Sequence, residues 1–140
     1  MRKNNPIRVI IDTNLWISFI ISKKLNRLEP LLFSNNIRIL FSSELIDELE
    51  ATIKKPKLKK YFSENDLDEM LDVFEPFIDF IKVKSKVKVC RDPKDDFLLA
   101  LAKDGKADYL LTGDNDLLGI GRIEKTIILK LKDFMDKNNR

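Results

Sequence analysis

Residues 92–118 read DPKDDFLLALAKDGKADYLLTGDNDLL, and this stretch decides the fold class. Its apolar residues first recur at helical spacing, which predicts a helix over 95–103 that ends near Gly105. The segment DYLLT at 108–112 is then a short apolar run, typical of a strand buried on both faces. A helix that leads directly into a buried strand is half of a parallel βαβ unit.

Strands and helices alternate on both sides of this stretch. Strands are predicted at 7–11 (IRVII), 37–41 (IRILF) and 126–129 (TIIL), and within 77–89, where lysines alternate with valines and a serine. Helices are predicted at 14–21, 25–33, from Ser42 to Pro56, from Ser63 to about Glu75, and at the C-terminus. Strands separated by helices imply right-handed crossovers. We therefore expect one domain over residues 1–140, a three-layer α/β/α sandwich with a mainly parallel central sheet.

The composition excludes several kinds of chemistry. The 140 residues include no histidine and a single cysteine, Cys90, so an internal disulfide and a zinc site built from His or Cys are excluded. General base catalysis by histidine is excluded as well. Charges interrupt every apolar stretch before 18 residues, and the N-terminus does not resemble a signal peptide, so we expect a cytoplasmic protein without a membrane span.

Acidic residues follow the predicted strands, where open parallel sheets bind their ligands. They are Asp12, then Glu44, Asp47 and Glu48, then Asp92, Asp95 and Asp96, and last Asp114 and Asp116. Asp95 shares the apolar stripe of its helix, where an unpaired charge would cost several kcal/mol. A metal ion would compensate for that charge, and oxygen ligands suit Mg²⁺ or Mn²⁺.

Each acid also has a structural explanation of its own. Asp92 or Asp95 can cap a helix, and the residues after Gly113 can form a turn. The acids of the helix predicted from Ser42 can lie on one solvated face, namely Glu44, Asp47 and Glu48. Because all these acids are expected at one sheet edge, a shared metal site explains them better than a separate structural role for each. Such a metal site can activate water and stabilise an in-line phosphoryl displacement. These two effects allow phosphodiester hydrolysis without a histidine.

The sequence resembles the PIN-domain family of metal-dependent ribonucleases, in particular the toxin components of toxin–antitoxin pairs. The matching segments, in this order, are IIDTNLWIS at 10–18, SSELIDELEATIKKPKL at 42–58 and DPKDDFLLALAKDGKADYLLTGDNDLL at 92–118. The resemblance covers essentially the whole chain. It implies an α/β/α fold, Mg²⁺ or Mn²⁺, cleavage of RNA, a homodimer and a small antitoxin protein as partner.

The resemblance also implies roles for individual residues. The metal-binding and catalytic acids would be Asp12, Glu48, Asp95, Asp114 and, as an accessory, Asp116. Asn14 would orient Asp12 or a bound water, and Thr112 would support the site at the end of its strand. Helical spacing alone does not separate Glu44 from Glu48, and Asp92 and Asp96 stay open as alternatives to Asp95.

Two lysine clusters have alternative explanations. Lys54, Lys55 and Lys57, with Lys59 and Lys60, form either a phosphate-binding rim for RNA or a solvated helix end, and the two are equally weighted. The alternating lysines at 82–88 are better explained as protection of an edge strand.

Two other functions are compatible with the acidic set. One is a non-catalytic domain that binds RNA or a protein partner around a structural metal. The other is a phosphoaspartate protein with Asp12 as the nucleophile, although Thr112, Gly113 and Asp114 then place a negative charge where that chemistry needs a lysine or a hydroxyl.

Overall fold

A six-stranded sheet forms the centre of the computed structural model, which describes residues 5–22, 30, 32, 36–87 and 95–138. The strand order is β3-β2-β1-β4-β6-β5, and every neighbouring pair is parallel except β5 and β6. The strands are β1 (Ile7–Ile11), β2 (Ile37–Phe41), β3 (Ile78–Phe80), β4 (Tyr109–Leu111), β5 (Arg122–Ile123) and β6 (Thr126–Leu129). The predicted mainly parallel sheet is confirmed.

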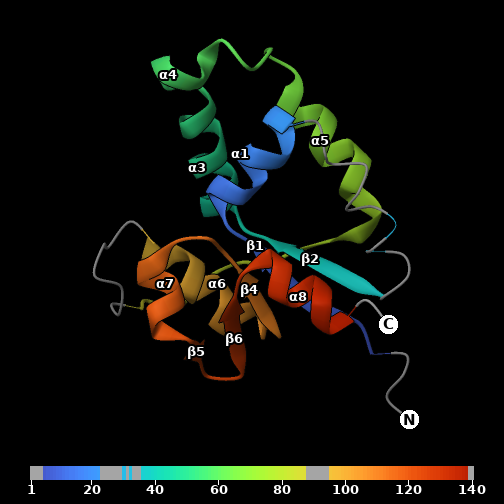
Figure 1. The fold of residues 1–140 in the computed structure, drawn as a ribbon, viewed down its shortest axis with the longest axis vertical. Helices are drawn as coiled ribbons and strands as arrows, with labels where there is room; N and C mark the ends of the chain where they lie inside the picture. The colour runs from blue at the N-terminus through green and yellow to red at the C-terminus, as the bar shows by residue number, and fades with distance from the viewer. Residues whose placement is uncertain (1–4, 23–29, 31, 33–35, 88–94, 139–140) are drawn as a thin grey trace.

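Helices cover both faces of this sheet (Figure 1). They are α1 (Thr13–Ser22), α3 (Ser43–Ile53), α4 (Pro56–Lys59), α5 (Asp66–Phe74), α6 (Asp96–Gly105), α7 (Asn115–Ile120) and α8 (Leu131–Asn138), with a 3₁₀ turn η1 at Glu75–Phe77. Figure 1 shows α1, α3 and α5 together on one side of β1 and β2. The three layers of the predicted sandwich are therefore present.

The side-chain contacts assign helices to faces. On one face, Phe41 of β2 stacks on Trp16 of α1, with ring centroids 5.5 Å apart, and Tyr109 of β4 packs on Phe134 of α8 at 5.2 Å. On the other face, α6 comes so close that a Cβ on Gly105 would lie 2.8 Å from Leu40 Cδ1. A glycine at the end of α6 therefore permits the close approach of helix and sheet, and a larger residue would displace the Leu40 side chain.

Trp16 lies at the centre of the core on the α1 face. It is 0% exposed and also packs against Phe19 and against Phe74 of α5, at centroid distances of 6.3 and 5.8 Å. These aromatic contacts fix α1 against the sheet, and α1 begins directly after Asp12. The position of Asp12 thus depends on the packing of a buried aromatic cluster.

The strand predicted within 77–89 is shorter than expected and ends before the lysines. β3 pairs with Ile39–Phe41 of β2, and the last hydrogen bond joins the Ile81 N–H to the Phe41 carbonyl at 2.8 Å. Because β2 gives way to α3 after Phe41, the described residues from Lys82 to Val87 do not pair with β2. Edge-strand protection was therefore wrong as an explanation for Lys82, Lys84 and Lys86.

Residues 81–87 instead run extended beside α6. Lys82, Lys84 and Lys86 are exposed and alternate with half-buried residues, as predicted, while Lys88 lies outside the described residues. The Asp104 carboxylate of α6 accepts the N–H groups of Lys84 and Ser85, at 2.6 and 2.8 Å, and the Ser85 hydroxyl. The Ser85 bonds, followed by the Lys84 bond, hold the pKa of Asp104 below its ordinary value.

Several boundaries differ from the prediction. Pro56 begins the short helix α4 after α3 has ended at Ile53, because proline fits the first turn of a helix. Helix α5 begins at Asp66, whose carboxylate accepts both the N–H and the hydroxyl of Ser63. The helix α7 and the strand β5 were not predicted. The helix predicted at 25–33 lies almost entirely outside the described residues.

A charged cluster joins three strands on the α6 face. Asp79 of β3 accepts hydrogen bonds from Arg8 of β1 at 3.1 Å and from Arg38 of β2 at 2.7 Å, and Arg8 also donates to the Gly105 carbonyl at 2.8 Å. The hydrogen bonds from Arg38 are the main reason that the pKa of Asp79 is held below its ordinary value. The positive charges of Arg38 and Arg8 act in the same direction.

We expect Asp79→Asn to destabilise the protein by about 1 kcal/mol at pH 7, since these side chains are partly exposed. A carboxylate with a lowered pKa contributes stability above its unfolded pKa, and that stability is lost as the pH falls through the folded value. Urea unfolding at pH 7 and at pH 2.5 measures the difference between variant and wild type. The cluster has no electrostatic role if that difference is as large at the lower pH.

The surface carries charges of both signs. Among the described residues, no helix is long and apolar enough to cross a membrane.

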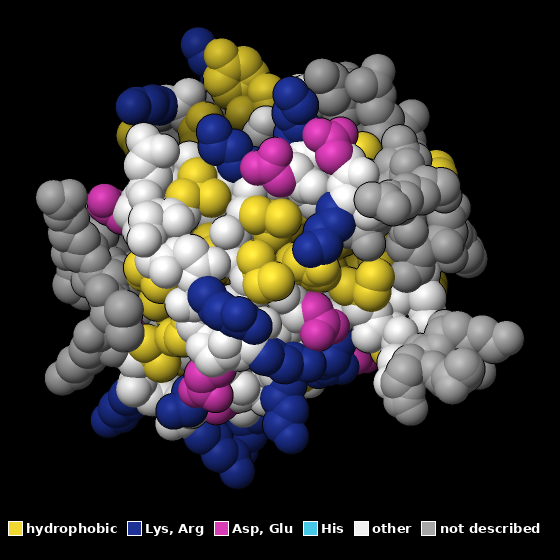
Figure 2. Space-filling view, turned by 60° about the horizontal axis from the view of Figure 1, so that its bottom comes forward, with side chains coloured by type: hydrophobic (Ala, Val, Ile, Leu, Met, Phe, Trp, Pro, Cys, Tyr) yellow, Lys and Arg dark blue, Asp and Glu magenta, His cyan; other side chains and the backbone are white. Residues whose placement is uncertain are grey.

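Figure 2 shows the end of the molecule that is lowest in Figure 1, where lysine and arginine side chains are spread around apolar surface, with acidic side chains among them.

Candidate active site

The parallel register brings the ends of β1, β4 and β6 together at one edge of the sheet. Hydrogen bonds continue one residue past the strands, from Asp12 N–H to the Leu111 carbonyl at 3.0 Å and from Thr112 N–H to the Leu129 carbonyl at 3.1 Å. Asp12 at the end of β1 thus lies beside Thr112 at the end of β4. The helices α1, α3 and α7 all begin at this edge.

Asp12 is a buried carboxylate, 4% exposed, and both of its oxygens accept hydrogen bonds. Oδ1 accepts the Leu15 N–H of α1 at 2.8 Å, and Oδ2 accepts the Thr112 hydroxyl. Burial raises the pKa of Asp12 above its ordinary value, although the two hydrogen bonds act against this, and the nearby charge of Asp114 raises the pKa further. The negative charge at this position is therefore costly to the fold by itself.

Thr112 positions two carboxylates at once. Its hydroxyl donates to Asp12 and accepts the Asp114 N–H at 3.0 Å. The Asp114 carboxylate in turn accepts the Leu117 N–H at 3.0 Å, which caps α7. One buried hydroxyl therefore ties the end of β1 to the start of α7.

Glu48 and Asp95 approach the same place from α3 and α6. Ser42 starts α3 by accepting the Leu45 N–H at 3.2 Å, which puts the half-buried Glu48 in the second turn. Asp95 is the N-cap residue of α6 and is also half-buried. The predicted placement of this helix is confirmed, since Leu98, Leu99 and Ala102 are all buried.

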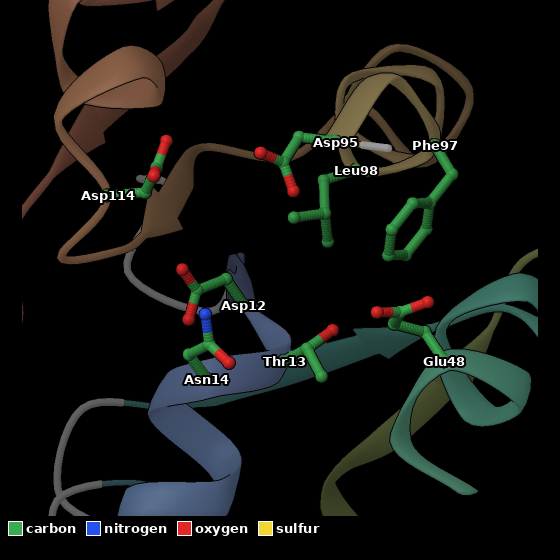
Figure 3. A pocket seen from close by; sticks show the side chains of 8 residues that line it. All are labelled: Asp12, Thr13, Asn14, Glu48, Asp95, Phe97, Leu98 and Asp114. Carbon is green, nitrogen blue, oxygen red and sulfur yellow. The ribbon is translucent and has the colours of Figure 1, made fainter. Parts of the chain in front are cut away.

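A pocket of about 60 Å³ lies between these elements. Its lining residues are Asp12, Thr13, Asn14, Glu48, Asp95, Phe97, Leu98 and Asp114. Figure 3 shows Asp12, Asp95 and Asp114 toward one end of the pocket and Glu48 toward the other, with the Thr13 hydroxyl between them. Four acids that are far apart in the sequence thus share one small polar cavity.

The other predicted residues lie around this pocket. Glu44 is exposed one turn before Glu48, and Asp116 is exposed in the first turn of α7. Asp96 is half-buried in the first turn of α6, and Asp92 lies outside the described residues. Of the two candidate glutamates Glu44 and Glu48, only Glu48 lines the pocket, and helical spacing alone could not show this.

The three lysines predicted to contact RNA are exposed but do not line the pocket. Lys54 is the C-cap residue that follows α3, Lys55 precedes α4, and Lys57 lies within α4. Along a helix, the six residues from Glu48 to Lys54 span about 9 Å. These lysines therefore lie beyond the pocket, at the far end of the helix that carries Glu48.

Sequence reasoning missed Thr13, which lines the pocket and is 7% exposed. The signal was its place directly after Asp12, inside the DTN segment. It also missed the apolar wall formed by Phe97 and Leu98. Apolar residues in the first turn of α6 are explained by core packing alone, so nothing in their pattern predicted a place at a site.

The described carboxylates surround the pocket without converging on one point. Among the residues that the structure describes, no three acidic side chains are gathered as closely as the ligands of one cation. The carboxylates that line the pocket offer only oxygen atoms as metal ligands, and such a ligand set suits a hard divalent cation.

The sequence of this chain matches a family model described as the PIN domain over residues 8–116. The chain belongs to the PIN domain family. PIN domains are, as a class, nucleases. The matched range includes all four acids that line the pocket.

Two comparisons with individual proteins agree with this membership. The uncharacterized protein MJ1680 of Methanocaldococcus jannaschii is 32% identical over 117 residues, which cover 81% of this chain and 75% of the relative. A chain in the crystal structure of VapBC2 from Rickettsia felis, bound to a DNA fragment from their promoter, is 20% identical and aligns with a TM-score of 0.54. That alignment covers 87% of this chain and 97% of the other, and it shows that the two share the PIN fold.

Proposed function

We propose that this PIN domain is a divalent-metal-dependent endoribonuclease. The observation that carries the proposal is the pocket at the carboxyl edge of the sheet, which Asp12, Glu48, Asp95 and Asp114 line from four separate chain segments. Because the chain has no histidine, carboxylates that hold a metal ion are the means by which it would hydrolyse a phosphodiester.

The pocket fits Mg²⁺ or Mn²⁺ by its charge and its chemistry. The buried Asp12 carboxylate has a raised pKa, and a cation beside it would offset both its burial and the repulsion from Asp114. A bound divalent ion supplies Lewis-acid stabilisation of the phosphodiester and a lower pKa for the attacking water. Thr112 holds the orientation of Asp12, and Asp116 and Asn14 lie close enough in sequence to support the primary acids.

The proposed substrate is RNA, which would lie over the pocket and extend along α3. Lys54, Lys55 and Lys57 would contact its phosphates beyond the reacting bond. The experiment is cleavage of a labelled single-stranded RNA by the purified protein with Mg²⁺ or Mn²⁺, with and without EDTA. Cleavage that persists in EDTA, or no cleavage with any divalent metal, contradicts the proposal.

Manganese should also stabilise the folded protein. We expect millimolar Mn²⁺ to raise the melting temperature by about 3–8 °C, because a cation that binds only the folded state shifts the unfolding equilibrium. Differential scanning fluorimetry measures this rise, and it should be absent in Asp12→Asn. A rise without RNA cleavage would favour a non-catalytic domain with a structural metal.

We also propose that the protein is the toxin of a toxin–antitoxin pair and forms a homodimer. The fold it shares with a chain of the VapBC2 complex supports this proposal, as do the toxin-like segments of the sequence. A small open reading frame directly beside the gene, whose product co-purifies with this chain and inhibits cleavage, would support the pairing. Light scattering of the purified chain measures its molar mass in solution and so tests whether it forms a dimer.

A further inference from the structure

Thr13 carries a buried hydroxyl that faces the proposed site. The residue is 7% exposed, lines the pocket, and its Oγ1 has no hydrogen-bond partner among the described residues. Figure 3 shows this oxygen pointing into the space bounded by Asp12, Glu48 and the start of α6. A buried hydroxyl without a partner costs free energy, so its retention in the pocket calls for a reason.

The local backbone leaves this hydroxyl without a partner. A helical threonine commonly donates to the carbonyl four residues earlier, but for Thr13 that residue is Val9, inside the β1 ladder. The nearby N–H groups are also occupied, since Leu15 donates to the Asp12 side chain and Trp16 to the Asp12 carbonyl. The Thr13 hydroxyl is therefore available to a molecule in the pocket.

Other buried hydroxyls in the described part of the chain have partners. Thr52 donates to the Glu48 carbonyl, Thr126 to the Ala107 carbonyl and Thr112 to Asp12, and Ser42 accepts from Leu45. The other unpartnered polar atom there is Trp16 Nε1, which belongs to the aromatic core and not to the pocket. Thr13 is thus set apart both by its lack of a partner and by its position.

We propose that Thr13 Oγ1 donates a hydrogen bond to a non-bridging phosphate oxygen of the substrate. This inference rests on the proposed function. Apart from Thr13 and the exposed Asn14, the polar side chains of the pocket are carboxylates, which accept hydrogen bonds when ionised. A phosphate also brings acceptors only, so it needs a donor among those carboxylates. Thr13 is the buried donor in the described lining, and it positions the phosphate against the acids.

The test compares variants that separate the hydroxyl from its packing. Thr13→Val removes the hydroxyl and keeps the branched shape, while Thr13→Ser keeps the hydroxyl. Thr126→Val is the matched control, because it removes a buried hydroxyl that has a protein partner away from the pocket. The measurements are kcat/KM for RNA cleavage, the melting temperature without metal, and the Kd of adenosine 5′-monophosphate in the presence of Mn²⁺ by calorimetry.

We expect Thr13→Val to lower kcat/KM and to weaken nucleotide binding by about tenfold each, with a melting temperature equal to or above that of wild type. Thr13→Ser should restore both properties. Thr126→Val should do the reverse, with a lower melting temperature and unchanged cleavage and binding.

Two results overturn the inference. One is a Thr13→Val variant that cleaves RNA and binds the nucleotide like wild type, which leaves the nuclease proposal intact. The other is a Thr13→Val variant that melts lower by as much as Thr126→Val, because the hydroxyl would then stabilise the fold. Wild-type protein that binds the nucleotide through Thr13 but cleaves no RNA would contradict the proposed function alone. Wild-type protein that neither binds the nucleotide nor cleaves RNA would contradict both this inference and the proposed function.

Discussion

Asp12→Asn should lower kcat/KM for metal-dependent RNA cleavage by about 10³-fold or more. Asp12 is the most buried acid of the pocket, and it is fixed by hydrogen bonds from Leu15 and Thr112. Asparagine keeps this size and shape but removes the negative charge that would hold a divalent cation. Single-turnover cleavage of a labelled RNA measures the loss.

The same variant should fold at least as well as wild type without metal. Because burial raises the pKa of Asp12, its ionised form costs stability at neutral pH, and wild type regains that stability as the pH falls through the raised value. The melting temperature of Asp12→Asn should therefore depend less on pH over that range.

The control for Asp12→Asn is Asp133→Asn, which neutralises an exposed carboxylate of α8 and should cleave like wild type. Asp114→Asn provides a second test in the pocket and should also lose activity. Full cleavage by a protein carrying both pocket substitutions, Asp12→Asn and Asp114→Asn, would refute the catalytic assignment.

Thr112→Val should destabilise the metal-free protein by about 3 kcal/mol at neutral pH. The substitution keeps the shape of the side chain but leaves the buried Asp12 carboxylate without its second donor and the Asp114 N–H without its acceptor. A buried charge that loses a hydrogen bond costs more than a neutral group does. Urea unfolding followed by circular dichroism measures the change.

The pH dependence identifies the cause of this loss. The Thr112 hydrogen bond lowers the pKa of Asp12, so its stabilising effect is greatest where Asp12 is ionised and declines as the pH falls through the Asp12 pKa. Thr126→Val removes a hydrogen bond to the neutral Ala107 carbonyl and should cost about 1 kcal/mol at every pH. Equal and pH-independent losses in both variants would show that Thr112 does not act through the Asp12 charge.

Local sequence signals predicted most elements because their physical causes are local. The β-branched run IRVII and the apolar spacing after Asp95 are visible in a few neighbouring residues, and both elements form where predicted. The Ser42 cap of α3 is an interaction across three residues and was also predicted. The end of β3 was not, because it depends on where the partner strand β2 stops.

The sequence by itself determined the fold class, the oxygen-only chemistry and the order of the acids, since residue type and short-range spacing carry that information. Only the tertiary structure decided which acids share a pocket. It placed Glu48 rather than Glu44 in the lining, linked Thr112 to Asp12 across 100 residues of chain, and turned an unpaired Thr13 hydroxyl toward the acids. The reason is physical: contacts between segments depend on strand register and helix packing, which no single stretch of sequence contains.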